Sequence, residues 1–424
     1  MEQLRINPRR LEQFMKEISA FGATEDGGVT RLPNSDEDRD ARNQLMEWFK
    51  AAGCETVVDQ VGNMFFILPG KNRNLPGVMT GSHCDSQPQG GRFDGILGII
   101  GGLEVVCTLR DAGIRLERDL IVVNWSNEEG SRFTPGCTGS GVFAGQLDLE
   151  EMYNLTDRNG CTFGKELERI GFKGETDFNP LPLHAAFEYH IEQGPVLERE
   201  KKTIGVPRGI VCLRWYDIDV AGVPNHVGPT PMADRQDALY AFSLMNTQVH
   251  DIALAAENVV ATVGEIQVTP NSRNVIPGHV HFTIDIRSWD EAGADRVCAQ
   301  IEASLARISQ EVGCRLDIQQ TWSVERAPFQ PDLVQLVRAT ADELSLPTLN
   351  MVSGASHDTI YINQVAPSAM IFVPSIGGRS HAEVEETSWE DCAAGTDVLL
   401  NCIMKTGNDP EGVTYPLGKM PRKG

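Results

Sequence analysis

The chain has 424 residues, which is too long for one compact core and predicts two or three domains. Its hydrophobic fraction of 41% and aromatic fraction of 7% are those of an ordinary soluble globular protein. The formal net charge of −22 argues against partners that present phosphate groups, namely nucleic acid and anionic membrane surfaces.

The first residues are charged and amphipathic, without the apolar core that a secretory signal needs. No run approaches the ~18 apolar residues of a membrane-spanning helix. The ten cysteines are scattered singly, with no CxxC pair, which fits a reducing cytosol better than a disulfide scaffold. We therefore expect a cytoplasmic enzyme that binds neither nucleic acid nor membrane.

The first half of the chain alternates between helical and strand-like patterns. Apolar residues at Leu11, Phe14, Met15 and Ile18 have helical spacing, and a similar pattern near 45–49 stops before Gly53. A glycine-rich apolar stretch at 95–113 is typical of a buried helix. Four short apolar runs predict strands at 78–83, 119–125, 185–191 and 368–375. This order favours an α/β sheet with right-handed crossovers.

The middle of the chain has a different rhythm. Strand, helix, strand, strand, helix and strand follow one another at 213–222, 233–255, 259–268, 279–288, 290–312 and 315–324. This βαββαβ order is that of a split βαβ, ferredoxin-like module. We predict an inserted domain at 212–328 within a catalytic α/β domain formed by residues 1–211 and 329–424. The tail from 407 to 424 looks irregular.

Polar side chains gather where the four predicted strands end, and in open α/β sheets ligands bind beyond the carboxyl ends of the strands. The residues are His83 and Asp85, the pair Glu128 and Glu129, His190, and His381. Each alone has an ordinary explanation, since a lone histidine is more often structural and a Glu–Glu pair is usually solvated. Four strand ends with the same chemistry favour one shared site.

The residue types favour a hydrolytic metal centre, because imidazole and carboxylate without thiolate suit zinc or manganese. The sequence contains five candidate ligands, which are too many for one catalytic ion that keeps an open coordination position. Two ions that share a carboxylate would use all five. The five are His83, Asp94, Glu129, His190 and His381. One glutamate of the pair could then act as general base, an effect of about 10²–10⁴-fold. Strand alternation turns Cys84 away from His83 and predicts a packing role for it.

Several stretches resemble those of a known family over nearly the full chain. They are "GSHCDSQPQGGRFDG", "NWSNEEGSRF", "FEYHIEQGPVLE", "NHVGPTPMADRQDAL", "PNSRNVIPG", "IDIRS", "SGASHD" and "FVPSIGGRSHAEVE". Their order and spacing resemble the hydantoinase/carbamoylase family of metal-dependent amidohydrolases, relatives of the co-catalytic zinc peptidases. The resemblance implies a zinc-peptidase-like α/β catalytic domain, an inserted lid and dimerisation domain, and a homodimer.

The resemblance also implies a role for each candidate side chain. Two divalent ions per subunit are expected, zinc first, with manganese, cobalt or nickel as alternatives. Asp94 would bridge them, Glu128 would be the general base, and the Asp85 carboxylate would orient His83. The remaining implied metal ligands are His83, Glu129, His190 and His381.

Further implied residues would contact the substrate. His226 resembles the family's transition-state histidine, which is thought to act from the partner subunit. Asn274 and Arg287 resemble residues that hold the substrate's carbonyl and carboxylate, and Gln193 resembles another contact. The ordinary alternatives are a surface histidine in a Pro/Gly/Asn-rich loop, a turn-forming asparagine, and an arginine that faces solvent or pairs with Asp285.

Departures from the family pattern concern the surroundings of the site. Many relatives have "HAG" where this chain has His226–Gly228, and they have a glycine at the position of Ser356. Relatives also commonly have an aliphatic residue at the position of Cys84 and "AML" at 136–138, where this chain has "GCT". No departure removes a predicted ligand or the base, so they bear on the choice of substrate. For His357 two alternatives stay open, packing near the site and contact with the substrate.

The hypothesis is cleavage of the carbamoyl (ureido) group of an N-carbamoyl-L-amino acid or N-carbamoyl-β-alanine, giving the amino acid, ammonia and carbon dioxide. The nearest alternative is an allantoate or ureidoglycolate amidohydrolase, followed by an aminoacylase- or dipeptidase-like hydrolase. A non-catalytic metal- or nucleotide-binding module is the remote alternative, since the glycine-rich stretch before 102 lacks GxGxxG.

Overall fold

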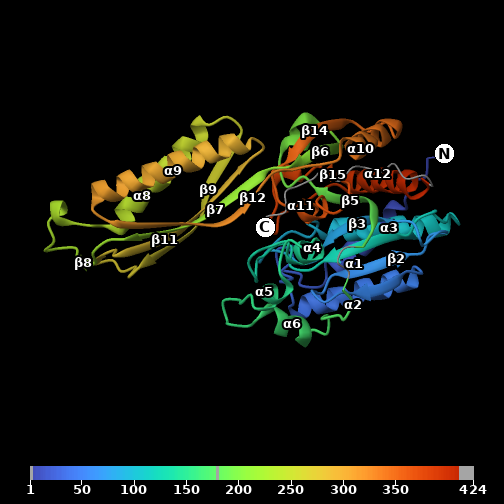
Figure 1. Cartoon of the computed structure of the whole chain (residues 1–424), viewed down its shortest axis with the longest axis horizontal. Coiled ribbons are helices and arrows are strands. Elements are labelled where there is room, and N and C mark those ends of the chain that lie inside the picture. The colour runs from blue at the N-terminus through green and yellow to red at the C-terminus, as the bar shows by residue number, and fades with distance from the viewer. Residues whose placement is uncertain (1–2, 178–180, 410–424) are drawn as a thin grey trace. The chain divides into compact units, whose positions relative to one another are not determined.

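A computed structural model describes residues 3–177 and 181–409, so the tail beyond 409, predicted to be irregular, lies outside the described residues. The chain divides into two compact units (Figure 1). The first contains the residues up to Gly209 and those from Pro328 onward, and the second contains Ile210–Ala327. The sequence analysis placed the corresponding changes at 212 and 328. The predicted α/β class is confirmed, because helices alternate with the strands of a large mixed sheet.

The first unit is built on a nine-stranded sheet of order β1-β2-β4-β3-β5-β15-β6-β13, with β14 paired to β6. Its strands are β1 (Glu55–Val58), β2 (Met64–Leu68), β3 (Gly77–His83), β4 (Leu120–Trp125), β5 (Leu183–Ile191), β6 (Ile204–Ile210), β13 (Ala327–Pro328), β14 (Thr348–Ser353) and β15 (Ser368–Val373). The four strands predicted from apolar runs are β3, β4, β5 and β15. They are adjacent and parallel, so their carboxyl ends lie at one edge of the sheet.

Helices of the first unit begin at clear capping signals. The Ser35 side chain accepts a hydrogen bond from the Asp38 N–H at the start of α2, and Ser388 caps α12 in the same way. The helices are α1 (Pro8–Ile18), α2 (Asp36–Ala51), α3 (Ile96–Asp111), α4 (Thr138–Phe143), α5 (Leu149–Tyr153), α6 (Phe163–Arg169), α7 (Val196–Glu200), α10 (Pro331–Glu343), α11 (Thr359–Ile362) and α12 (Trp389–Gly407), with a 3₁₀ turn at Ile376–Gly378. Among the described residues no helix is both long and apolar enough to cross a membrane.

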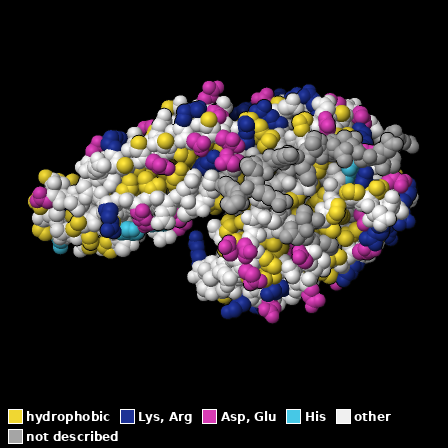
Figure 2. Space-filling view, in the orientation of Figure 1, with side chains coloured by type: hydrophobic (Ala, Val, Ile, Leu, Met, Phe, Trp, Pro, Cys, Tyr) yellow, Lys and Arg dark blue, Asp and Glu magenta, His cyan; other side chains and the backbone are white. Residues whose placement is uncertain are grey.

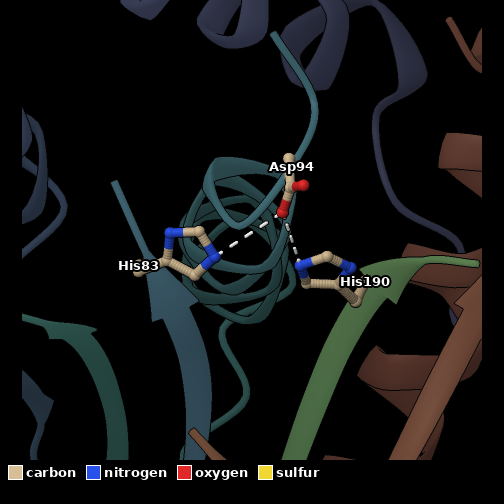
Figure 3. A group of neighbouring side chains, drawn as sticks. All are labelled: His83, Asp94 and His190. Atoms are coloured by element: carbon tan, nitrogen blue, oxygen red, sulfur yellow. Dashed lines mark ion pairs between the residues drawn. The ribbon is translucent and has the colours of Figure 1, made fainter. Parts of the chain in front are cut away.

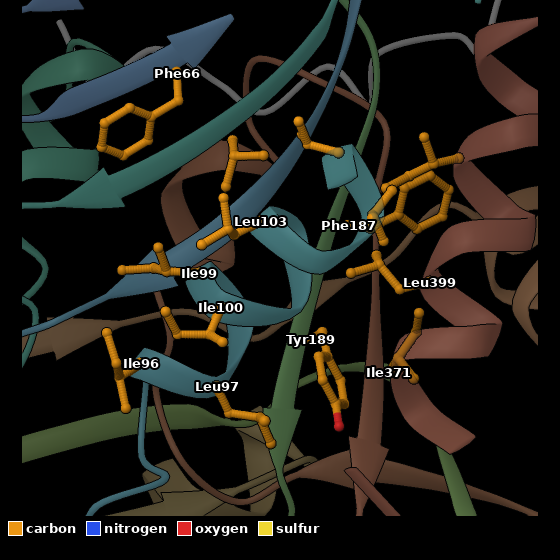
Figure 4. Close-up of a cluster of buried hydrophobic side chains, with 14 of the residues drawn as sticks. Phe66, Ile96, Leu97, Ile99, Ile100, Leu103, Phe187, Tyr189, Ile371 and Leu399 are labelled. Carbon is orange, nitrogen blue, oxygen red and sulfur yellow. The ribbon is translucent and has the colours of Figure 1, made fainter. Parts of the chain in front are cut away.

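Helix α3 packs closely on the sheet that carries the predicted ligands. Its apolar side chains, among them Leu97 and Ile100, lie with Tyr189 of β5 and Leu399 of α12 in one buried cluster (Figure 4). Gly98 permits the close approach, because a Cβ there would lie 2.6 Å from the Tyr189 carbonyl oxygen. The start of α3 is thereby held beside the ends of β3 and β5.

The second unit is a four-stranded antiparallel sheet of order β12-β7-β11-β9 with two helices. Chain order and sheet order together are those of a split βαβ module. Its elements are β7 (Cys212–Ala221), β8 (Asn225–His226), a 3₁₀ turn (Met232–Asp234), α8 (Ala238–Ala255), β9 (Val259–Thr269), β10 (Val275–Ile276), β11 (His279–Ser288), α9 (Glu291–Val312) and β12 (Arg315–Val324). Helix α8 begins five residues later than expected, because the Asp237 side chain caps it by accepting from the Leu239 and Tyr240 N–H groups.

Candidate metal centre and catalytic site

Two histidines and an aspartate meet at the carboxyl ends of the central strands. His83 is the last residue of β3, His190 is next to last in β5, and Asp94 comes from the loop before α3. The Nε2 atom of His190 lies 3.0 Å from Asp94 Oδ1, and that of His83 lies 3.6 Å from the same oxygen. Both imidazoles point toward this carboxylate and are almost completely buried (Figure 3).

The backbone orients both imidazoles as ligands. His83 Nδ1 lies 2.9 Å from the carbonyl oxygen of Asp85, and His190 Nδ1 lies 2.9 Å from that of Ile191. Because a carbonyl only accepts, each Nδ1 carries the proton and each Nε2 faces Asp94, as in ligand histidines. The family resemblance implied that the Asp85 carboxylate orients His83. Its Oδ1 is 3.7 Å from His83 Nδ1, so the closest contact is the main-chain carbonyl instead.

A second group of potential ligands shares Asp94 with the first. His381 Nε2 lies 3.4 Å from Asp94 Oδ2 and 3.4 Å from Glu129 Oε2. Asp94 Oδ1 therefore faces one group and Oδ2 faces the other, and ligand atoms within each group lie close enough to hold one metal ion. Nitrogen and carboxylate oxygen donors of this kind suit zinc or manganese. The five predicted ligands lie together, and their arrangement fits two ions that share one carboxylate.

The shared carboxylate is held by residues from two other segments, the turn after β5 and the loop before α12. Gln193 Nε2 donates to Asp94 Oδ2 at 2.7 Å, and the Ser380 hydroxyl donates to the same oxygen at 3.1 Å. The Glu385 carboxylate accepts from the main-chain N–H groups of Phe93 and Asp94, each at 3.0 Å. Its Oε2 lies 2.7 Å from the Ser380 hydroxyl, so Glu385 and Asp94 share the single proton of that hydroxyl. Glu385 thus ties the Asp94 loop to the His381 loop.

Sequence reasoning found Gln193 through the family resemblance and missed Ser380 and Glu385. It also missed Gln87, whose Nε2 donates to Glu129 Oε2 at 2.8 Å. Ser380 and Glu385 flank His381 in the sequence, but no spacing rule marks either of them as a partner of Asp94. Their contacts join loops almost 300 residues apart and become visible only in the folded chain.

Glu128 stands beside the two groups without belonging to either. Its Oε2 lies 3.5 Å from His83 Nε2, and the side chain is buried. The N–H groups of Glu128 and Glu129 donate to the Asp85 carboxylate at 3.3 and 3.2 Å, which fixes this turn. Burial raises the pKa of Glu128 well above its usual value, and the charge of Asp358 adds to it despite the opposing charge of His83. A carboxylate with a raised pKa is a stronger base than an exposed glutamate.

Charge in the centre favours proton binding by its histidines when no metal is bound. Burial would lower the pKa of His381, but Asp94 and Glu129 raise it to about 9. Burial would raise the pKa of Asp94, but His190, His381 and His83 hold it well below its usual range. The aspartate is therefore ionised, and a metal ion must displace a proton from His381 in order to bind there.

Two residues left open by the sequence lie outside both ligand groups. The Cys84 thiol donates to Asp38 Oδ1 at 3.1 Å and is buried. The His357 ring lies edge-on to His190 with ring centroids 4.5 Å apart, and its Nε2 is 3.0 Å from the Ser353 hydroxyl. His357 thus packs against His190, one of the candidate ligands.

The remaining predicted residues lie in the second unit and do not all meet. His226 pairs with Val275 between β8 and β10, next to Asn274, and both His226 and Asn274 are exposed. Arg287 lies toward the opposite end of β11, where its guanidinium forms an ion pair with Asp285 at 2.8 Å. The eight residue-to-residue steps from His279, the start of β11, to Arg287 correspond to about 27 Å of strand. Within one copy, His226 and Arg287 therefore cannot contact the same small molecule.

A sheet edge at which one carboxylate faces two groups of potential ligands, with a buried glutamate beside them, is the arrangement expected of a metal-dependent hydrolase. Sequence comparison identifies the particular family. The chain belongs to Peptidase family M20/M25/M40, whose sequence profile matches residues 79–405.

Individual relatives extend this similarity over almost the whole chain. N-carbamoyl-L-amino-acid amidohydrolase of Rhizobium meliloti is 42% identical over 406 residues, which are 96% of this chain and 98% of the relative. Allantoate amidohydrolase of Escherichia coli is 34% identical, over 92% of this chain and 95% of the relative. The crystal structure of a hydantoinase/carbamoylase-family amidase from Burkholderia vietnamiensis matches with a TM-score of 0.92 and 46% identity, over 96% of this chain and 98% of that one. The predicted family and amidohydrolase class are confirmed.

Proposed function

We propose that the protein removes the carbamoyl group from an N-carbamoyl-L-amino acid, or from N-carbamoyl-β-alanine, and releases the amino acid, ammonia and carbon dioxide. The observation that carries hydrolysis is the sharing of Asp94 by two ligand groups beside Glu128. Similarity to the Rhizobium meliloti enzyme over nearly the full length of both chains supports the carbamoyl substrate.

The side chains of the first unit would bind the metal ions, transfer the proton and contact the substrate. Two bound divalent ions, zinc first among the candidates, would polarise the substrate's carbonyl and lower the pKa of the attacking water. His83, Asp94, Glu129, His190 and His381 would hold them. Glu128 would take the proton of the water and pass it to the leaving nitrogen, since its raised pKa suits both steps. Gln193, which reaches Asp94, would contact the substrate at the same edge.

Residues of the inserted unit would recognise and stabilise the substrate. The Arg287 guanidinium would exchange Asp285 for the substrate carboxylate, because a planar fork binds carboxylates through two hydrogen bonds. His226 and Asn274 would donate hydrogen bonds to the oxyanion that forms at the carbamoyl carbon.

We also propose a homodimer, because about 27 Å of β11 separates Arg287 from the start of that strand, the end at which β10 and its partner His226 lie. If both side chains contact one small substrate, they come from two different copies. The second unit has apolar side chains at its surface (Figure 2), among them Tyr240 and Leu254 of α8 and Val260 and Ile266 of β9. Strand β9 is an edge strand of its sheet. Exposed apolar groups beside an open edge support a lid and dimerisation role for this unit.

A screen that measures both released ammonia and released amino acid tests the proposed reaction, because hydrolysis of an acyl compound or a dipeptide gives an amino acid without ammonia. Metal-loaded protein is given N-carbamoyl-L-amino acids, N-carbamoyl-β-alanine, allantoate, ureidoglycolate, N-acyl amino acids and dipeptides, with Glu128→Gln as the matched control. We expect ammonia from the carbamoyl compounds and none from the control. Turnover confined to acyl compounds or dipeptides would reject the ureido assignment.

The second candidate is an allantoate amidohydrolase, which the 34% identity to the Escherichia coli enzyme favours. Allantoate and ureidoglycolate carry the same ureido and carboxylate groups, so the same residues would serve. In the screen, a kcat/KM for allantoate or ureidoglycolate above that of every N-carbamoyl amino acid would assign this function instead.

A further inference from the structure

The turn that follows the Glu128–Glu129 pair folds back onto it. The Cys137 N–H donates to the Glu128 carbonyl at 2.8 Å, and the Thr138 N–H donates to the Asn127 carbonyl at 3.2 Å. The Asn127 side-chain amide reinforces the turn by donating to the Phe133 carbonyl and to the Thr138 hydroxyl. Cys137 is therefore fixed next to Glu128 by main-chain and side-chain bonds.

Cys137 reaches the Glu128 carboxylate with its side chain. It precedes α4 in the left-handed conformation, with a φ of 50°, and is buried. Its Sγ lies 3.4 Å from Glu128 Oε1, whereas Oε2 is the oxygen near His83. In the part of the chain that the structure describes, this thiol is the one hydrogen-bond donor to the Glu128 carboxylate. The two oxygens of the glutamate thus have different surroundings.

The chemistry of the thiol is that of a neutral donor. Burial, together with the charges of Glu128 and Asp358, raises the pKa of the Cys137 thiol well above its usual value. A protonated thiol is a weak hydrogen-bond donor, whereas metal binding and nucleophilic attack need a thiolate. Oxidation also requires thiolate character and exposure, so an oxidant-sensing role does not fit this thiol.

We propose that Cys137 is a positioning residue for Glu128, whose thiol holds Oε1 so that Oε2 remains directed toward the reacting groups. The inference rests on the proposed function, in which Glu128 is the general base. A donor on Oε1 also leaves Oε2 as the oxygen that receives the proton of the attacking water. Oε2 of Glu128, which faces the ligand groups, would then carry the proton that passes to the leaving nitrogen.

Three substitutions at one position test the hydrogen bond. Cys137→Ser keeps a donor, whereas Cys137→Ala and Cys137→Gly remove it, and the glycine variant also tolerates the left-handed backbone. We expect kcat on the ureido substrate to fall about tenfold in the alanine and glycine variants, with KM unchanged, and to stay within about threefold of wild type in the serine variant. Cys54, another buried thiol, supplies the controls Cys54→Ala and Cys54→Ser, for which no change in kcat is expected.

Infrared spectroscopy of the metal-free protein gives a readout that does not depend on activity. The difference between wild type and Cys137→Ser isolates the S–H stretching band of Cys137. At a pH high enough to ionise Glu128, Glu128→Gln should shift this band to higher frequency, because an amide oxygen accepts a hydrogen bond less strongly than a carboxylate. A band that does not move would overturn the proposal. So would equal losses of kcat in the serine and alanine variants, or undiminished kcat in both the alanine and glycine variants.

The failure of this inference is distinguishable from that of the proposed function. If Glu128→Gln retains turnover, Glu128 is not the base, and the positioning role falls with it. If Glu128→Gln loses turnover while Cys137→Ala and Cys137→Gly keep the wild-type kcat, the base stands and only the role of Cys137 is rejected. Thermal melts and metal analysis of each variant identify any that fail to fold, and the remaining donor-free variant then decides.

Discussion

At the scale of single residues, Asp94 is the side chain on which the whole centre depends, because its two oxygens face two different ligand groups. We predict about two divalent ions per wild-type chain, about one in His381→Ala, and close to none in Asp94→Ala. Elemental analysis after dialysis against metal-free buffer measures these contents. Asp94→Ala with undiminished metal would show that the carboxylate is not shared.

Glu128 should behave differently from the ligands. Glu128→Gln preserves the size of the side chain but removes the proton acceptor. We expect unchanged metal content and a kcat lower by about 10²–10⁴-fold. Steady-state ammonia release and metal analysis on the same preparation check both parts. Loss of metal together with activity would make Glu128 a ligand instead of a base.

The raised pKa of His381 makes metal binding depend on pH. An exposed histidine titrates near 6.5, whereas His381 in the metal-free protein titrates at about 9. Its proton therefore stabilises the metal-free fold below pH 6.5, and this contribution is lost as the pH rises through 9. Because metal must displace that proton, affinity should rise from pH 6.5 to 9.

Calorimetric titration with Mn²⁺ in buffers of different ionisation enthalpy measures this dependence as proton release. His381→Ala should release fewer protons at the same pH and show a flatter dependence of affinity on pH. Equal proton release by wild type and variant would remove His381 from the explanation.

At the scale of secondary-structure elements, strand β3 must lie close to β4 for His83 to reach the centre. Gly81 has a φ of 142°, and a Cβ there would lie 2.1 Å from the Val123 carbonyl oxygen of β4. We predict that Gly81→Ala lowers the free energy of unfolding by about 3 kcal/mol, since strain and overpacking act together. Urea unfolding followed by tryptophan fluorescence measures it. Gly354→Ala, whose Cβ would meet nothing within 4 Å, should change stability by less than about 0.5 kcal/mol.

The elements that the sequence predicted best have a single clear period. In β11 apolar residues alternate, and every second side chain is buried, as expected for a sheet with one covered face. The four parallel strands were predicted because they are short apolar runs followed by polar residues. Helix α12, in contrast, was not predicted. It is buried on most sides, so no polar face marks its period, and only its position against α3 and β15 explains it.

The candidate site was also predictable only where a local sequence pattern marks its residues. Its five candidate ligands were predictable because parallel strands deliver their ends to one edge, and the residue types there agree in chemistry. The supporting contacts were not, because Glu385 and Cys137 act through loops whose paths no local pattern determines. For Asp85, the sequence indicated the right neighbour of His83, but the atom in closest contact is a main-chain oxygen.

At the scale of the whole molecule, the question is whether one copy of the chain suffices for catalysis. His226 and Arg287 belong to the same unit, yet most of the length of β11 separates them, so a small ureido acid cannot contact both in one copy. If the catalytic base comes from the first unit of one copy and the histidine comes from a second copy, each active site contains residues of two chains. Single substitutions at Glu128 and His226 would then inactivate different components of the same site.

Mixed dimers of two inactive variants distinguish these alternatives. Glu128→Gln and His226→Ala are each expected to be nearly inactive as pure proteins. When they are unfolded together, refolded and loaded with metal, about half of the dimers combine one chain of each kind, and each such dimer contains one site with both residues intact. We therefore expect about a quarter of the wild-type activity to return, because one of the two sites is restored in half of the molecules. If each site is instead built from a single chain, the mixture stays as inactive as its components, and sizing of the wild-type protein as a monomer would exclude the joint site as well.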